Sequence, residues 1–225
     1  MSFVNPMNSK IRAVIFDMDG VLVDSEPLIN AAAIAMFKEK ELTVRPEDFL
    51  PFVGAGEDRY IGGVAEKYHF PLDLPAAKRR TYQIYLDLVS SQLEPFLGAC
   101  DFVLTCRKAG LLVAVASSAD KIKVVANLQK INFPPEFWDT VVVGEQVKHK
   151  KPAPDIFLTA AQNLNVKPSA CVVVEDAVNG IQAAKAAGMR CIAVAQTFPA
   201  ERFREADVVR DRISQVQLSD LVPLK

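Results

Sequence analysis

The chain has 225 residues, 50% of them hydrophobic, which is enough for one large domain or for a domain that carries a small insertion. Its formal net charge of −1 argues against nucleic acid or an anionic membrane as the main partner. No stretch approaches the roughly 18 consecutive apolar residues of a membrane span. We therefore expect a soluble monomer that acts on a small molecule.

The N-terminal residues and the cysteines indicate the cellular compartment of the protein. Residues 1–10 show neither the apolar core of a signal peptide nor the arginine-rich pattern of a transit peptide. The 4 cysteines form no C-x-x-C pair and are typical of buried, reduced thiols. We expect an intracellular, cytoplasmic protein, with a plastid as the alternative if a transit peptide precedes this sequence.

The first predicted element is a buried strand at 13–16, an apolar run of the kind found in parallel sheets. It stops at Asp17 and Asp19, and Gly20 then lets the chain turn sharply. Ligands of open α/β sheets lie outside the carboxyl ends of the strands, so a functional site is expected here. The pair is not an EF-hand, which needs Gly at loop position 6 and Glu at position 12, where this chain has Leu28. By itself, the pair is also compatible with a simple strand-end turn.

A segment at 25–92 follows in which we find helical patterns only. Pro27 fits the first turn of its first helix, where a missing N–H costs nothing. The apolar face of that helix comprises Ile29, Ala32, Ala33, Met36 and Phe37. Further helical stretches follow around 57–68 and 75–92. We predict a small all-helical inserted domain at 25–92 and an α/β core formed by 1–24 and 93–225.

From residue 93 onward, β-rich runs alternate with helical patterns. The predicted strands are 112–116, 140–143, 171–174 and 191–194, with a short sixth at 207–209. The predicted helices are 98–109, 120–130, 155–164 and 177–187. Asp155 is the expected N-cap of the third helix, and Gly188 ends the fourth. This alternation predicts a Rossmann-like, doubly wound parallel sheet with helices on both faces.

A second pair of acids, Glu175 and Asp176, follows the strand at 171–174. Two strand ends that carry acids can converge on one cation, and Mg²⁺ prefers few carboxylates, waters and substrate phosphate. Our expected ligands are Asp17, Asp176 and the Met18 carbonyl, with Glu175 acting through a water. Helix capping by Asp176 is the alternative interpretation.

Two further segments suggest phosphate ligands. Ser117 and Ser118 follow the strand at 112–116, and a hydroxyl with backbone N–H groups at a helix start can bind an anion. An ordinary N-cap is the alternative for the serines. Lys151 precedes two prolines that stiffen the backbone, and we prefer it to Lys150 as the fixed ammonium group.

The acids at the two strand ends have different expected roles. Asp17 is the candidate nucleophile because an ionised carboxylate can form an acyl-phosphate. Asp19 is the candidate general acid/base for the leaving oxygen and for water. The negative charge of the four acids exceeds the positive charge of Mg²⁺ and Lys151 by one when all of them are ionised. The four acids are Asp17, Asp19, Glu175 and Asp176. The charge balance therefore favours one protonated carboxyl, which we assign to Asp19.

Together these runs resemble the haloacid dehalogenase-like superfamily. The matching segments are FDMDG (16–20), ASS (116–118), KKPAPD (150–155) and VVVEDA (172–177). DGVLVDSE (19–26), KPAPDIF (151–157) and EDAVNGIQAAKAAGM (175–189) are similar to the β-phosphoglucomutase-like subfamily, which has a helical cap. The resemblance implies a nucleophile, a general acid/base, two phosphate ligands and an Mg²⁺ site at the same residues, with 25–92 as the cap.

Asp19 also discriminates between activities within that family. Dehalogenases lack this second aspartate, so the resemblance favours phosphoryl transfer. Mutases of the subfamily grip a second phosphate with basic cap residues, whereas this chain has Val53-Gly54-Ala55-Gly56-Glu57 at that loop. We therefore expect an Mg²⁺-dependent phosphatase of a small phosphorylated metabolite. A sugar-phosphate mutase and a non-catalytic phosphate-binding regulatory protein are the alternatives.

Several residues are expected to contact the substrate. They are Gly20, Ser118, Gly54, Gly56, Glu57 and Arg80.

Overall fold

The computed structural model describes residues 11–53 and 56–222, and its centre is a six-stranded parallel sheet with strand order β3-β2-β1-β4-β5-β6. The strands are β1 (Ala13–Phe16), β2 (Leu112–Ala116), β3 (Thr140–Val142), β4 (Cys171–Glu175), β5 (Arg190–Val194) and β6 (Val208–Arg210). The strand order reverses between β1 and β4, the position at which open α/β sheets bind their ligands. The predicted fold class is confirmed.

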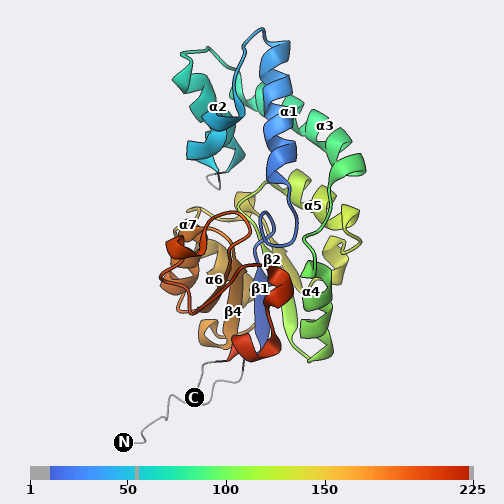
Figure 1. Ribbon diagram of the computed structural model, residues 1–225, viewed down its shortest axis with the longest axis vertical. Helices are drawn as coiled ribbons and strands as arrows, with labels where there is room; N and C mark the ends of the chain where they lie inside the picture. The colour runs from blue at the N-terminus through green and yellow to red at the C-terminus, as the bar shows by residue number, and fades with distance from the viewer. Residues whose placement is uncertain (1–10, 54–55, 223–225) are drawn as a thin grey trace, which may run out of the picture.

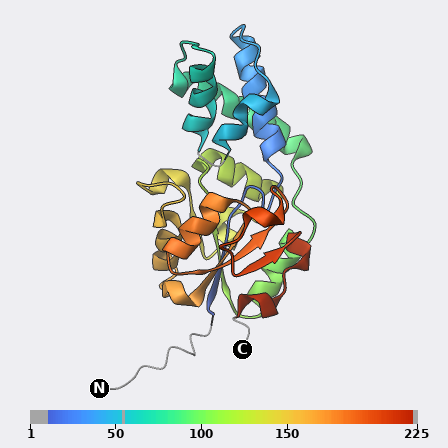
Figure 2. The ribbon, with the colours of Figure 1, turned by 60° about the vertical axis from the view of Figure 1, so that its left-hand side comes forward.

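Helices cover both faces of the sheet (Figures 1 and 2). They are α4 (Ala99–Lys108), α5 (Lys121–Lys130), α6 (Asp155–Asn163) and α7 (Val178–Ala186). Val14 and Phe16 of β1 pack in one hydrophobic cluster with α4 and α5, whereas Ala13 and Ile15 pack in a second cluster with α6 and α7. This division follows from the period-2 alternation of a strand whose two faces are both buried.

The helix bounds differ from the predicted ones by a residue at most of the ends, and the N-cap predicted at Asp155 is wrong. Asp155 is the first residue of α6 rather than its N-cap, which is Pro154. The Asp155 carboxylate instead accepts hydrogen bonds from the backbone N–H of His149, at 3.3 Å, and contacts the His149 ring at 2.9 Å. Pro154 has a preset φ, and no side chain caps the first turn of this helix.

Between β1 and β2 lie three further helices beyond the carboxyl end of the sheet (Figure 1). They are α1 (Glu26–Glu39), α2 (Glu57–Lys67) and α3 (Leu74–Gln92), with a 3-10 turn at Pro46–Phe52. The five apolar residues predicted for the first helix face are all buried in α1. We refer to residues 25–92 as the helical segment; its role as a separate cap domain stays a prediction.

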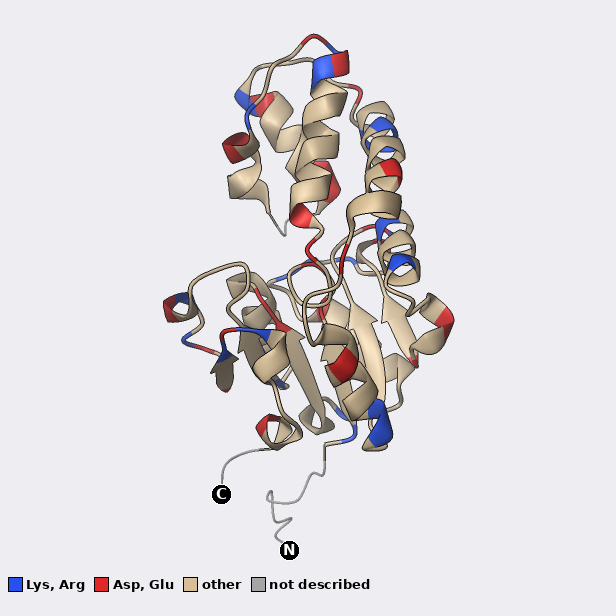
Figure 3. Ribbon diagram, turned by 45° about the vertical axis from the view of Figure 1, so that its right-hand side comes forward, with Lys and Arg blue, Asp and Glu red and all other residues tan. Residues whose placement is uncertain are grey.

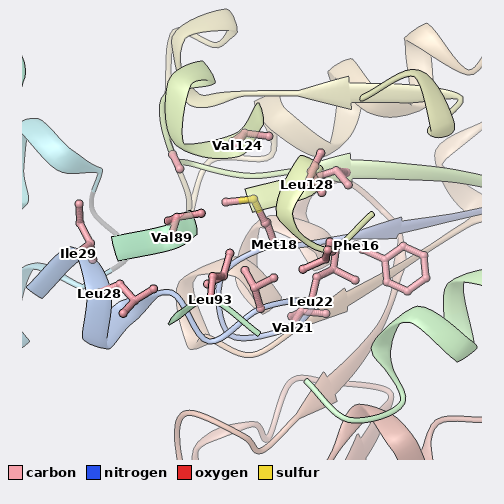
Figure 4. Packing of buried hydrophobic residues seen from close by; sticks show 14 of the residues in the cluster. Phe16, Met18, Val21, Leu22, Leu28, Ile29, Val89, Leu93, Val124 and Leu128 are labelled. Carbon is pink, nitrogen blue, oxygen red and sulfur yellow. The ribbon is translucent and has the colours of Figure 1, made fainter. Parts of the chain in front are cut away.

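The helical segment shares a core with the sheet. In Figure 4, Val89 and Leu93 at the end of α3 lie against Val124 and Leu128 of α5, with Met18 between them. The buried Tyr85 hydroxyl on α3 also donates a hydrogen bond to Asn127 Oδ1 of α5, at 2.7 Å. One hydrophobic cluster therefore runs from the sheet into the helical segment.

Candidate active site

The acids that follow β1 and β4 lie side by side. Parallel pairing places Phe16 opposite Val174, and the Asp17 N–H donates to the Val174 carbonyl at 2.9 Å. Carboxylate oxygens of Asp17, Glu175 and Asp176 lie within 4.8 Å of one another, and all three residues are buried. Burial raises the pKa of Asp17 to about 7 and raises that of Asp176 well above its usual range. Such a concentration of buried negative charge needs compensating cations.

Lys151 supplies one of these cations. Its Nζ lies 2.6 Å from Asp17 Oδ1 and 2.6 Å from Glu175 Oε1, and its side chain is only 4% exposed. Burial alone would lower the pKa of Lys151, but the Asp17 and Glu175 carboxylates raise it. Lys150 points elsewhere, with its Nζ 3.4 Å from the Ser118 carbonyl.

Both oxygens of Glu175 already have partners. Oε1 contacts Lys151, and Oε2 accepts the backbone N–H groups of Asp176 and Ala177, each at 2.7 Å. A Cβ at Gly180 would lie 1.7 Å from Glu175 Oε1, so only glycine leaves room for this carboxylate. Glu175 therefore orients Lys151 and the chain after β4, which leaves Asp17 and Asp176 as the carboxylates with free oxygens for a metal.

The Met18 carbonyl does not fit the ligand set expected for it. It accepts backbone N–H groups from Val21, Leu22 and Val23, at 3.4, 2.9 and 3.2 Å, which occupy its lone pairs. The Met18 side chain is buried in the hydrophobic cluster. In the described part of the chain no hydrogen bond reaches the Asp19 carbonyl, which makes that carbonyl the better candidate.

The residues around Asp17 and Asp176 fit a divalent cation of the Mg²⁺ type. Two buried carboxylates and a backbone carbonyl are hard oxygen donors. Gly20 holds the chain close to this position: its φ is +78°, and a Cβ there would lie 1.9 Å from Asp176 Oδ2. The Thr197 hydroxyl, from the loop after β5, lies on the same side of Gly20 as this carboxylate.

Asp19 is held by two groups that sequence reasoning missed. The Ser25 hydroxyl donates to Asp19 Oδ1, and Lys123 Nζ lies 3.2 Å from Asp19 Oδ2. Lys123 adds a second cation, but its other partner, Glu57, adds a fifth acid. The charge count that favours one protonated carboxyl is therefore unchanged, and the assignment of that proton to Asp19 stays a prediction. A sequence signal existed, because helical spacing places Lys123 on the same face as Val124 and Leu128, which is the buried face of α5.

The serines after β2 face the same cavity. Ser117 is 1% exposed, and its Oγ accepts the Ala119 N–H at 3.1 Å, so its own proton is free for a phosphate oxygen. Ser118 Oγ is buried, and no described residue forms a hydrogen bond with it. Both serines line a cavity of about 780 Å³ together with Asp17, Asp19 and Lys151.

The helical segment forms one wall of this cavity. Its lining residues there are Glu26, Ile29, Phe52, Val53, Gly56, Glu57 and Tyr60. Acidic residues stand where α1 begins, at its end nearest the sheet (Figure 3). Among the described residues of the helical segment, no lysine or arginine lines the cavity. Glu57 is 5% exposed, and its Oε1 lies 3.7 Å from Lys123 Nζ.

One expected substrate contact is not brought to the site. Arg80 lies on the exposed side of α3 in a bidentate pair with Glu39, at 2.7 and 2.8 Å, and does not line the cavity. Arg80 thus forms an ion pair on the surface of the helical segment instead of contacting the cavity. Gly54 lies outside the described residues, whereas Gly20, Ser118, Gly56 and Glu57 all line the cavity.

Sequence comparisons connect this geometry with known proteins. The model of haloacid dehalogenase-like hydrolases matches residues 11–188. The protein SUPPRESSOR OF QUENCHING 1, chloroplastic, of Arabidopsis thaliana is 45% identical over 218 residues; the match covers 95% of this chain but 21% of that protein. Hexitol phosphatase B of Escherichia coli K12 is 32% identical over 226 residues, which cover 95% of this chain and 97% of the phosphatase.

Solved structures agree with the sequence matches. CbbY from Rhodobacter sphaeroides, crystallised with phosphate, gives a TM-score of 0.86 at 28% identity over 94% of this chain and 99% of its own. A variant of CbbY in complex with xylulose-(1,5)bisphosphate gives the same TM-score at 27% identity. No described helix is both long and apolar enough to span a membrane. The chain belongs to the haloacid dehalogenase-like hydrolases, a family of enzymes.

Proposed function

We propose that this protein is an Mg²⁺-dependent phosphatase that hydrolyses the monoester of a small phosphorylated sugar or polyol. The observation that carries the proposal is the convergence of Asp17, Asp19, Ser117 and Lys151 on one cavity, beside the free carboxylate of Asp176. The similarity to hexitol phosphatase B and to CbbY supports a carbohydrate phosphate as substrate. The plastid relative supports a plastid as one possible location.

In the first step, Asp17 attacks phosphorus and the bond to the ester oxygen breaks. Asp19 gives a proton to the departing alcohol, and the Ser25 hydroxyl and Lys123 hold its carboxyl in place. In the second step, Asp19 takes a proton from water, which attacks the phosphorus of the aspartyl-phosphate. Inorganic phosphate leaves and the Asp17 carboxylate is restored.

The remaining residues position the phosphoryl group. Lys151 and Ser117 would hold its equatorial oxygens, since both present donors to the cavity beside Asp17. Asp17, Asp176 and the Asp19 carbonyl would hold Mg²⁺. When bound there, Mg²⁺ supplies positive charge next to the transferring phosphoryl group.

A phosphatase is favoured over a mutase by the wall that the helical segment contributes. A mutase must hold a second phosphate on that side, yet the described residues there include two glutamates and no basic side chain. Two arginines, Arg202 and Arg204, line the cavity from the loop after β5 instead. A mutase would require a bisphosphate activator and would hydrolyse its phospho-enzyme slowly, and neither behaviour is expected here.

The test is hydrolysis of p-nitrophenyl phosphate and of a panel of sugar and polyol phosphates, with Mg²⁺ and with a chelator. We expect turnover that needs Mg²⁺ and that falls on the order of 10³-fold or more in Asp17→Asn, which keeps the shape but loses the nucleophile. Full turnover by Asp17→Asn would refute the mechanism. Saturable binding of a phosphate analogue without any hydrolysis would favour the non-catalytic alternative.

A further inference from the structure

Glu57 enters the cavity from the helical segment at the first turn of α2. The preceding Gly56 has a φ of +85°, and a Cβ there would lie 2.5 Å from Lys150 Nζ of the core. This close approach places the start of α2 directly against the core. Glu57 lines the cavity and is 5% exposed, so its carboxylate is turned inward.

The Glu57 carboxylate is incompletely partnered. Oε1 lies 3.7 Å from Lys123 Nζ, which is an ion pair but longer than a hydrogen bond. Oε2 is buried and has no hydrogen-bond partner among the residues that the structure describes. An unpaired buried carboxylate oxygen is costly, so this position favours a ligand that brings a hydrogen-bond donor.

Lys123 relates the Glu57 carboxylate to the reacting end of the substrate. The same ammonium lies 3.2 Å from Asp19 Oδ2 and 3.7 Å from Glu57 Oε1. The two carboxylates therefore flank one nitrogen, and their nearest oxygens are no farther apart than the sum of those distances. A group that meets Glu57 must belong to the part of the leaving alcohol next to the ester oxygen that Asp19 serves.

The charges around Glu57 select the kind of donor. A substrate ammonium would lie beside the Lys123 ammonium, which repels it, and a second phosphate would lie beside Glu57 and Glu26. A neutral hydroxyl can donate to Glu57 Oε2 without either conflict. We propose that Glu57 accepts a hydrogen bond from a hydroxyl on a carbon adjacent to the ester carbon, so that the enzyme selects monophosphates of polyols or sugars.

This inference rests on the proposed function, and a matched pair of substrates tests it. Glycerol 1-phosphate and propyl phosphate have the same chain length and differ in hydroxyl groups. We expect the wild type to prefer glycerol 1-phosphate in kcat/KM by about 10-fold or more. In Glu57→Ala we expect a loss of about 10–100-fold on glycerol 1-phosphate and of less than about 3-fold on propyl phosphate.

Two variants separate recognition from folding. Glu57→Gln keeps the size of the side chain and one acceptor oxygen, so it should retain an intermediate preference for glycerol 1-phosphate over propyl phosphate. This variant replaces Glu57→Ala in the comparison if Glu57→Ala fails to fold. Asp58→Ala is the control, because Asp58 is the next residue of α2, pairs with Lys78 at 2.7 Å and does not line the cavity. We expect this control to keep the wild-type preference.

The outcomes are distinguishable. Equal losses on both esters in Glu57→Ala and Glu57→Gln would overturn the proposal, because Glu57 would then act on Lys123 and Asp19 rather than on a hydroxyl. An absence of preference in the wild type would also overturn it. Wild-type hydrolysis of p-nitrophenyl phosphate, which has no such hydroxyl, reports on the proposed function separately, and a lack of turnover of all three esters would refute both.

Discussion

The floor and the wall of the cavity differ in the short contacts that hold their charged groups. The floor, formed by Asp17, Asp19, Ser117, Lys151 and Asp176 of the α/β core, is tied together by short contacts such as those of Lys151. The wall comes from the helical segment, and its Glu57 leaves one buried oxygen unpaired. A floor organised in advance suits chemistry common to many substrates, whereas an unpaired group suits recognition of a particular one.

Removal of Lys151 should produce the largest effect among the remaining tests, because it acts on the floor. Lys151→Ala leaves the buried Asp17 and Glu175 carboxylates without their ammonium and removes a phosphate ligand. We expect kcat/KM to fall about 10²–10³-fold on every phosphate ester, hydroxylated or not. Lys150→Ala is the matched control and should stay within a few-fold of the wild type. Equal effects of the two variants would contradict the assignment of the ammonium.

Lys123 belongs to the core and contacts both Asp19 of the floor and Glu57 of the wall. Its removal therefore tests whether catalysis at the floor depends on this contact with the wall. Lys123→Met leaves Asp19 and Glu57 facing each other without their shared cation. We expect kcat to fall about 10–100-fold, with partial recovery in Lys123→Arg, and thermal stability to fall as well because a buried pair is broken. Lys121→Met, on the first turn of the same helix, should change neither. A kcat for Lys123→Met equal to that of Lys121→Met would show that the floor works without this contact.

The smallest effect should come from a contact that holds the wall together. Asp48, in the turn before α2, accepts hydrogen bonds from Lys67 at 2.5 Å, Tyr68 at 2.6 Å and the Arg45 N–H at 2.8 Å. We expect Asp48→Asn to lower the melting temperature at pH 6 by about 2–4 °C, the effect of roughly 1 kcal/mol in a chain of this size, and to leave turnover of p-nitrophenyl phosphate unchanged.

The pH dependence of that contact gives a second measurement. Hydrogen bonds from Lys67 and Tyr68 lower the pKa of Asp48 to about 2. The stabilisation is complete above the unfolded-state pKa of about 3.9 and is lost as the pH falls towards the lower, folded-state value. The difference in melting temperature between wild type and Asp48→Asn should therefore shrink from pH 5 to pH 2. A difference that is constant over this range would mean that the charge of Asp48 contributes nothing.

The same contrast explains what the sequence could and could not predict. Asp17, Glu175 and Asp176 follow buried strands, and the parallel sheet order alone brings strand ends together, so their proximity was predictable. Lys123 was missed because its partners, Asp19 and Glu57, lie far from it along the chain and meet only after α2 packs on the core. Arg80 was misjudged for the same reason, since its partner Glu39 comes from another helix.

The Met18 error has a different origin. A strand-end motif predicts which residues lie near a metal but not which carbonyl is free, because that depends on the hydrogen bonds of the following turn. Here backbone N–H groups of the turn at 20–23 form hydrogen bonds with the Met18 carbonyl, so this carbonyl is not free to bind a metal. The domain boundaries and the roles assigned to the site residues remain predictions that the activity tests address.

The hydrophobic cluster that runs from the sheet into the helical segment has a consequence for unfolding. Val89 of the helical segment and Leu93, the residue that directly follows α3, pack in one buried cluster with Met18 and Leu128 of the core. Opening the end of α3 would expose apolar groups on both sides at once, so this end cannot unravel at low free-energy cost. We expect its backbone amides to exchange with solvent as slowly as those of α5, and the chain to lose both regions in one cooperative transition.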